Sequence, residues 1–224
     1  YAIRPMVISK TTEWSTLTQL YPSLSDEQIR KLEHFVALLL EWNAQVNLIS
    51  RKDTEQVLWH HIAHSLCPLL FFTFPASFRI LDLGTGGGLP GIPLAIALPN
   101  VRFCLVDSIA KKIRAVETMC ASLNLRNVEV QRSRVEELRT TYPLVVTRGV
   151  APLTQLWSWV KPIVTVPTRE NTTTPHGLLA YKGYPFTESL PEAQAIVRIY
   201  PLKDRVPNDA FLGAKALVNV FSSI

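Results

Sequence analysis

RILDLGTGGGLPGIPLA, residues 79–95, is the stretch that decides the fold of this 224-residue chain. It begins as a short apolar strand, passes through a glycine-rich turn and continues as an apolar segment that predicts a helix. A strand, glycine turn and helix in this order form the first unit of a doubly wound α/β sheet, where ligands bind beyond the carboxyl ends of the strands. The glycine turn is therefore the first candidate for a binding site.

Strand and helix patterns alternate after this stretch. Four further strands are expected at 101–106, 128–130, 144–147 and 178–181. Helices are expected at 90–98, 111–123 and 153–160. This alternation predicts a parallel sheet with helices on both faces. Two more strands, at 195–199 and 216–221, would make the sheet mixed, and a loop is expected at 167–175.

The first 75 residues are predicted to be helical. Ser25 and Gln28 have the spacing of a capping box, and the apolar positions that follow recur at helical intervals. A second helix is expected over Thr54–Leu66. We therefore expect a helical cap over residues 1–75 and a sheet domain over residues 76–224.

The composition excludes several classes of protein. Cys67, Cys104 and Cys120 are odd in number and far apart, which argues against a disulfide framework or a zinc site and predicts small core residues. No apolar run approaches the length of a membrane span, and no signal-peptide pattern is present. We expect a cytoplasmic monomer without a metal or a membrane partner. The formal net charge of +5 fits an anionic partner.

Two kinds of ligand fit the glycine turn. Gly86, Gly88 and Gly91 satisfy GxGxxG, so a nicotinamide or flavin dinucleotide is one candidate. S-adenosylmethionine is the other. Both ligands contain an adenosine, and Asp107, at the end of the next strand, could accept hydrogen bonds from the ribose of either.

Two further features favour S-adenosylmethionine. A pyrophosphate needs free N–H groups at the start of the helix, where Pro90 and Pro93 each remove one. Asp82 precedes the glycines, where its carboxylate is expected to face the cationic methionyl end of the cofactor, directly or through water.

Seven further motifs accompany the glycine turn. They are Glu41-Trp42-Asn43 with Asn47-Leu48, His61-Ile62, Ser65-Leu66, Asp107-Ser108 with Lys111-Lys112, Ser133-Arg134-Val135-Glu136-Glu137, Thr147-Arg148 and Lys182-Gly183. With the segment from Leu81 to Ala95, they resemble the motifs of the small-subunit (16S) ribosomal RNA guanine-N7 methyltransferases, also called glucose-inhibited division protein B or RsmG. The resemblance runs from about residue 24 to residue 183.

The resemblance implies a class I S-adenosylmethionine-dependent methyltransferase fold, Rossmann-like and preceded by helices. The implied reaction is methyl transfer from S-adenosylmethionine to N7 of a guanine in 16S ribosomal RNA, free or in the small subunit. The resemblance and the interpretation of the glycine turn together predict the cofactor-binding residues, which are Asp82, Gly84, Gly86, Leu89, Asp107, Val135, Glu136 and Arg148. Arg148 and Lys182 are the expected catalytic residues, and Lys182 is placed to reach the target base. His64 departs from the family pattern, because many members have Asp at that position.

The residues around the site fit guanine N7 as the target. N7 carries a lone pair and no proton, so its methylation needs no strong general base. The (Asp/Asn)-Pro-Pro-aromatic run typical of exocyclic-amine methyltransferases is replaced by Thr147-Arg148-Gly149-Val150, and no cysteine is placed to act as the nucleophile of a pyrimidine C5 enzyme. A methyltransferase acting on another RNA or on protein, and a non-catalytic adenosine- or RNA-binding module, are the alternatives.

Basic residues are concentrated between residues 109 and 148, a segment that contains eight Lys and Arg residues and only four Glu residues. Such an excess suits a surface that follows phosphates. The expected RNA contacts are Lys111, Lys112, Arg114 and Arg134. His60, His61 and His64 lack a metal-site pattern, which favours structural packing over a metal site.

Overall fold

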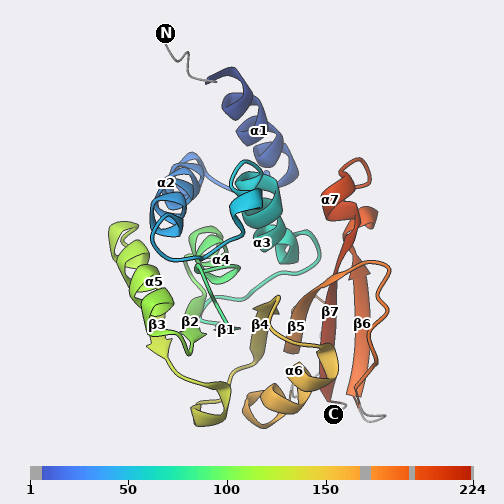
Figure 1. The fold of residues 1–224 in the computed structure, drawn as a ribbon. Coiled ribbons are helices and arrows are strands. Elements are labelled where there is room, and N and C mark those ends of the chain that lie inside the picture. Colours follow the sequence, from blue (N-terminus) through green and yellow to red (C-terminus); the bar gives the residue numbers. More distant parts are fainter. Residues whose placement is uncertain (1–6, 167–172, 192–194, 223–224) are drawn as a thin grey trace.

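The computed structural model describes residues 7–166, 173–191 and 195–222 as a seven-stranded sheet with helices on both faces (Figure 1). The strands are β1 (Arg79–Leu83), β2 (Arg102–Asp107), β3 (Val128–Arg132), β4 (Leu144–Arg148), β5 (Gly177–Gly183), β6 (Ala195–Pro201) and β7 (Lys215–Ser222). Their order in the sheet is β3-β2-β1-β4-β5-β7-β6. Strands β1 to β5 are parallel, and β7 is antiparallel to both of its neighbours. The predicted mixed, doubly wound sheet is confirmed.

Seven α-helices and several short 3₁₀ turns are present in the described residues. The helices are α1 (Val7–Leu20), α2 (Asp26–Asn43), α3 (His64–Leu66), α4 (Gly91–Ala97), α5 (Ala110–Ser122), α6 (Leu153–Val160) and α7 (Ala210–Gly213). The predicted bounds of α6 are correct to the residue, and those of α4 and α5 to within one. Of the expected loop at 167–175, residues 167–172 lie outside the described residues.

The central strands β1, β2 and β4 are apolar on both faces, as expected of parallel strands covered by helices. In β1, Ile80 belongs to a core that it shares with α1 to α5, whereas Leu81 belongs to a second core that it shares with α6. Leu105 and Val106 of β2 divide in the same way. This period of two fixes which face each helix covers.

The amino-terminal helices are built into the first of these cores. Ser25 and Gln28 form the predicted capping box of α2, and the Gln28 amide also donates to the carbonyls of Ile96 and Ala97 at the end of α4. Figure 1 shows α2 and α3 on either side of α4, with α1 above α3. The division at residues 75 and 76 stays a prediction.

The expected helix at Thr54–Leu66 is wrong in its type and its start. A π-helix (Leu58–Ala63) leads into the single turn of α3 and then a 3₁₀ turn (Cys67–Leu70). In a regular α-helix the His64 amide would bond the His60 carbonyl, but it donates to His61 and Trp59 instead. The His60 carbonyl accepts from Arg148, a tertiary contact that local periodicity does not reveal.

The three cysteines are free and buried, as predicted for core residues. Across the part of the chain that the structure describes, we find no helix with the length and apolarity needed to cross a membrane.

Strand order reverses at β1, which lies between β2 and β4. The turns that follow β1 and β4 therefore meet at the carboxyl edge of the sheet, where a doubly wound fold binds its ligand.

Candidate functional site

The glycine turn after β1 is held in a conformation that requires glycine. Gly84, Gly86 and Gly88 all have positive φ, at +72°, +57° and +83°. A Cβ on Gly84 would clash with the Val150 side chain. The backbone at Gly84 therefore packs against the loop after β4 so closely that no side chain fits between them.

Asp82 lies beneath this turn and holds it in place. Its buried Oδ2 accepts hydrogen bonds from the Thr85 hydroxyl at 2.7 Å and the Gly91 amide at 2.8 Å. Oδ1 is buried without a hydrogen-bond partner among the described residues. Asp82 is not among the residues that line the cavity beside the turn. The expectation that its carboxylate faces the cofactor, directly or through water, stays a prediction.

All residues in the first turn of α4 are described, and none of them has a free amide hydrogen. Pro90 and Pro93 carry none. The amide of Gly91 is bonded to the buried carboxylate, and that of Ile92 to the Gly88 carbonyl at 2.7 Å. A pyrophosphate would need such amides. The geometry thus strengthens the sequence argument for S-adenosylmethionine over a dinucleotide.

Burial raises the pKa of Asp82 from 3.8 to about 6, although the hydrogen bonds from Thr85 and Gly91 lower it. Between these two pH values the folded chain keeps a proton that the unfolded chain has released. Stability contributed by this carboxyl is therefore full below pH 3.8 and is lost as pH rises through 6.

We expect Asp82→Asn to become progressively more stable than the wild type as pH rises from 4 to 7, by about 3 kcal/mol at the upper end. The amide keeps an acceptor for Thr85 and Gly91 and places its NH₂ at the unpartnered position. Urea unfolding of both proteins at several pH values measures the difference. A difference that stays constant with pH would contradict the raised pKa.

Asp107 ends β2 and faces the turn from the opposite side. Its Oδ2 accepts from the Gly86 amide at 3.1 Å, and its Oδ1 from the Ile109 amide at 2.9 Å. Each carboxylate oxygen has further lone-pair capacity. Asp107 is thus oriented by backbone donors and can still accept hydrogen bonds from a ligand.

A cavity of about 500 Å³, the first cavity, opens between the glycine turn, the end of β2 and the loops after β3 and β4. Its volume lies in the range typical of small-ligand sites. Seven of the eight residues expected to bind the cofactor line it: Gly84, Gly86, Leu89, Asp107, Val135, Glu136 and Arg148. Sequence reasoning missed the apolar walls given by Leu48, Ile109, Val150 and Trp159.

Arg148, at the end of β4, lies in the wall between the first cavity and a second one. Its guanidinium donates to the His60 carbonyl at 3.3 Å and contacts His61 Nδ1 at 3.1 Å. Burial lowers the pKa of Arg148, which nevertheless remains a cation. No carboxylate of the described residues forms an ion pair with it.

The histidines form the support of Arg148. Burial, followed by the Arg148 charge, lowers the pKa of His61 to about 4, so its ring is neutral and can accept at Nδ1. The His60 ring stacks on Phe211 at 3.8 Å, and the buried His64 ring meets Phe211 and Tyr181 edge-on. The described residues hold no group of three metal-type ligands.

The second cavity, of about 490 Å³, lies at the ends of β4, β5 and β7. Lys182 lines it and is held by three contacts, to the Ala151 carbonyl at 2.8 Å and to both oxygens of Glu188 at 2.9 Å. Glu188 Oε2 also accepts from the Leu153 amide at 2.7 Å. Sequence reasoning found Lys182 but missed Glu188, which lies outside any regular element.

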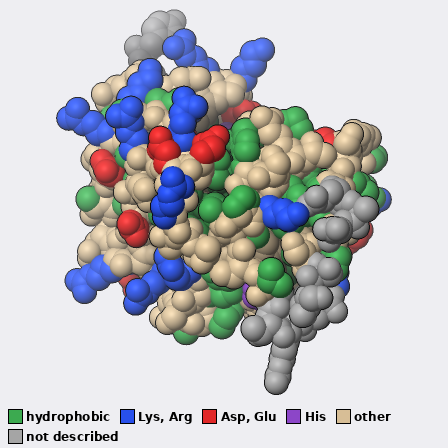
Figure 2. All heavy atoms as spheres, turned by 90° about the horizontal axis from the view of Figure 1, so that it is seen from below, with side chains coloured by type: hydrophobic (Ala, Val, Ile, Leu, Met, Phe, Trp, Pro, Cys, Tyr) green, Lys and Arg blue, Asp and Glu red, His purple; other side chains and the backbone are tan. Residues whose placement is uncertain are grey.

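The four residues expected to contact RNA divide into two pairs. Lys112 and Arg134 line the first cavity, whereas Lys111 and Arg114 lie exposed on α5 and do not. Figure 2, which views the molecule from below Figure 1, shows Lys and Arg gathered on the left half of that face, the side of α5 and β3. A few acidic side chains lie among them.

Comparisons with known proteins point to one family. A family model described as "rRNA small subunit methyltransferase G" matches residues 28–196. Ribosomal RNA small subunit methyltransferase G of Bacteroides fragilis is 40% identical over 167 residues, which cover 75% of this chain and 80% of that protein. The protein of the same name from Christiangramia forsetii is 39% identical over 204 residues, covering 90% and 94%.

Among solved structures, a point mutant of MtNAS in complex with S-adenosylmethionine aligns with 84% of this chain and 73% of its own. The TM-score is 0.50 and the identity is 13%. This similarity extends to the fold alone.

Proposed function

The chain belongs to the rRNA small subunit methyltransferase G family, and on that premise we propose that it transfers a methyl group from S-adenosylmethionine to N7 of a guanine in 16S ribosomal RNA. One structural observation carries this beyond family membership. Seven residues expected to bind the cofactor, drawn from four separate segments, meet around a single cavity at the topological switch point.

The first cavity would hold the cofactor. Asp107 would accept hydrogen bonds from the ribose hydroxyls, and the bare backbone at Gly84 and Gly86 would let the ligand lie against the main chain. Val135 and Glu136 would lie beside the adenine. When bound, S-adenosylmethionine supplies an electrophilic methyl group on its sulfonium.

The chain's own task is to place and hold the base. Guanine N7 has a lone pair and no proton, so the residues around it need not remove one. Alignment of the two reactants can account for several of the roughly 7–11 kcal/mol available from positioning. The second cavity shares a wall with the first, and this supports the proposal that it receives the base.

We propose that Lys182 and Glu188 recognise the guanine in the second cavity. The pair presents a donor beside carboxylate acceptors, 2.9 Å apart. This matches the O6 acceptor and the adjacent N1–H donor of guanine. Adenine has the opposite arrangement, a donor at N6 and an acceptor at N1, and would match neither group.

Replacing Glu188 by Gln is expected to lower kcat/KM for methyl transfer about 10- to 100-fold, the effect of losing one good base contact. The amide keeps an acceptor for the Leu153 amide but presents an NH₂ group to Lys182. Transfer of labelled methyl to 16S RNA measures the change. Lys203→Gln, outside both cavities, serves as the control, and unchanged transfer by the Glu188 variant would contradict base recognition.

The basic residues beside the cavities would hold the RNA backbone. Lys112 and Arg134, on the rim of the first cavity, and Lys111 and Arg114, on the exposed side of α5, are proposed to contact phosphates. Their charges suit phosphates better than the purine ring, which becomes positively charged as N7 is methylated.

The helical cap, residues 1–75, is proposed to complete the site. Leu48 lines the first cavity, and His60 and His61 hold Arg148. Because one chain lines both cavities, we propose that the enzyme works as a monomer. Because the proposed substrate is ribosomal RNA, we also propose that the enzyme is located in the cytoplasm.

The proposed reaction is tested by its product. The purified chain is incubated with labelled S-adenosylmethionine and either small subunits or naked 16S RNA that lack the modification. Nucleoside mass spectrometry should then find 7-methylguanosine. Another methylated nucleoside, or methylated protein, would reassign the substrate, and cofactor binding without any transfer would indicate a non-catalytic module.

A further inference from the structure

One large cavity lies away from the proposed active site. It has a volume of about 1160 Å³ and lies between α2, the end of α4 and the amino ends of β1, β2 and β3. We call it the amino-edge groove. A strand of five or six residues, about 17–20 Å long, separates it from the carboxyl edge where the first cavity opens.

Two arginines lie side by side in this groove. Arg79 and Arg102 begin the parallel strands β1 and β2, and they are direct partners in the register of the sheet. Both are exposed, and no carboxylate of the described residues forms an ion pair with either. Like charges in this position destabilise a sheet. The pair therefore favours an anionic partner from outside the chain.

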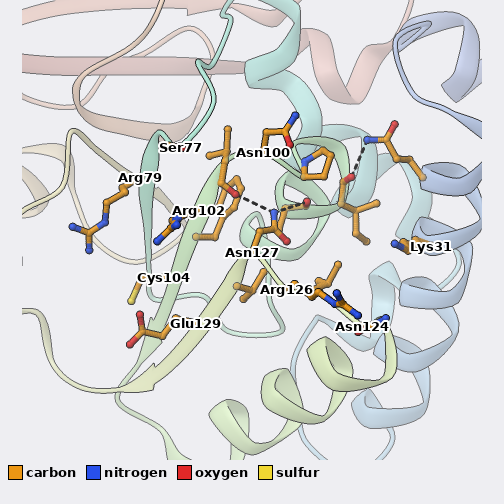
Figure 3. Close-up of a pocket in the computed structure, with 18 of the residues that line it drawn as sticks. Lys31, Ser77, Arg79, Asn100, Arg102, Cys104, Asn124, Arg126, Asn127 and Glu129 are labelled. Atoms are coloured by element: carbon orange, nitrogen blue, oxygen red, sulfur yellow. Dashed lines mark hydrogen bonds between the residues drawn. The ribbon is translucent and has the colours of Figure 1, made fainter.

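Further polar side chains lie across the groove from these arginines. In Figure 3, Arg79 and Arg102 lie on one side, and Arg126, Asn124 and Lys31 lie on the other. Arg126 is exposed and has no ion-pair partner among the described residues, whereas Lys31 is bonded to Glu27 at 3.1 Å.

Acidic side chains do not cancel this charge. Glu27 and Glu129 also line the groove, but its four basic residues leave an excess of two positive charges. Glu27 is the partner of Lys31, and Glu129 forms no ion pair with a described residue.

The end of α4 also opens into the groove, and its carbonyls would repel an anion if they were bare. They are covered by two amide side chains. Gln28 donates to the carbonyls of Ile96 and Ala97, and Asn127 donates to those of Ala95, Leu98 and Val101. The dashed lines in Figure 3 mark hydrogen bonds of this set. The negative end of the helix is thereby masked within a basic groove.

We propose that the amino-edge groove binds phosphate groups of the RNA substrate, as a docking surface separate from the active site. This inference rests on the proposed function for the identity of the RNA. The basic groups lie along both sides of an open groove and do not converge on one point, which suits a chain of phosphates better than a single small anion. Exposed Asn100 and Asn124 provide amide groups for the sugar–phosphate backbone.

The test uses the double variant Arg79→Gln/Arg102→Gln of the full chain and naked 16S RNA. We expect its Kd for the RNA to rise at least about tenfold at low salt, because two charge-assisted contacts are lost. The slope of log K against log salt should become shallower by about 1.4, because two phosphate contacts to single-stranded RNA are lost. The Kd for S-adenosylmethionine should not change. Arg79→Lys/Arg102→Lys should restore most of the RNA affinity.

Arg198→Gln/Arg205→Gln is the matched control, because it removes two arginines that lie outside the groove. Arg198 is on β6 at the opposite edge of the sheet, and Arg205 follows the 3₁₀ turn Leu202–Asp204. Equal losses in both double variants, or an unchanged Kd and salt slope in the groove variant, would overturn the proposal. A defect seen with small subunits but not with naked RNA would also overturn it, in favour of a ribosomal protein as the partner.

RNA binding is measured without S-adenosylmethionine, so the outcome is independent of catalysis. If the wild type makes no 7-methylguanosine while the groove variant still loses RNA affinity, the proposed function fails and the docking surface stands. Thermal unfolding of each variant shows whether the fold is retained.

Discussion

Asp107→Ala is expected to weaken the binding of S-adenosylmethionine about 10²- to 10⁴-fold. The carboxylate is held by the Gly86 and Ile109 amides, so its remaining lone pairs are fixed in direction before a ligand arrives. Two hydrogen bonds to a charged acceptor contribute about 3–6 kcal/mol together, which gives this range of Kd. Loss of the Gly86 contact would also loosen the turn.

Isothermal titration calorimetry with S-adenosylmethionine measures the effect. Asp107→Asn keeps the shape and one acceptor but loses the charge, so its Kd should fall between those of the wild type and the alanine variant. Asp204→Ala, in the 3₁₀ turn Leu202–Asp204, is the control for removal of a carboxylate elsewhere. Cofactor affinity that survives in Asp107→Ala would show that the ribose is bound by other groups.

The sheet and its switch point could be predicted from the sequence because both depend on local patterns. The apolar run before the glycines and the strands that follow it have buried residues on both faces. Proline at position 90 and glycine at positions 84 and 86 act through the backbone of their own turn, so their effect can be reasoned without knowing the neighbours. The residues of that turn therefore came together where the sequence placed them.

The supporting contacts could not be predicted, because they join segments far apart in the chain. The His60 carbonyl is diverted to a residue 88 positions later, and the helix around it widens as a result. Glu188 reaches Lys182 from an irregular segment that has no periodicity. The hydrogen bonds by which Asp82 supports the turn could not be predicted either, since a strand residue can point toward the ligand or beneath the turn and the sequence does not distinguish them.

Arg148→Met is expected to lower methyl transfer about 10²-fold or more while leaving the free energy of unfolding nearly unchanged. Arg148 lies in the wall that both cavities share, so its loss would misplace cofactor and base relative to one another. Stability should survive because the guanidinium is a buried cation without an ion-pair partner among the described residues. Replacing such a charge with an apolar side chain of similar length removes its desolvation cost and offsets the two lost hydrogen bonds.

A purely structural role and a positioning role for Arg148 predict different effects of a substitution. A purely structural arginine would lower the unfolding midpoint in urea together with activity, whereas the proposed positioning role predicts a fall in kcat at an almost constant midpoint. Arg148→Lys keeps the charge but cannot reach both the His60 carbonyl and His61 Nδ1 in the same way, so it should recover cofactor affinity more than kcat. Single-turnover transfer to 16S RNA at saturating cofactor separates the two quantities. Loss of stability in proportion to activity would place Arg148 in the scaffold of the site and leave the alignment of the reactants to other residues.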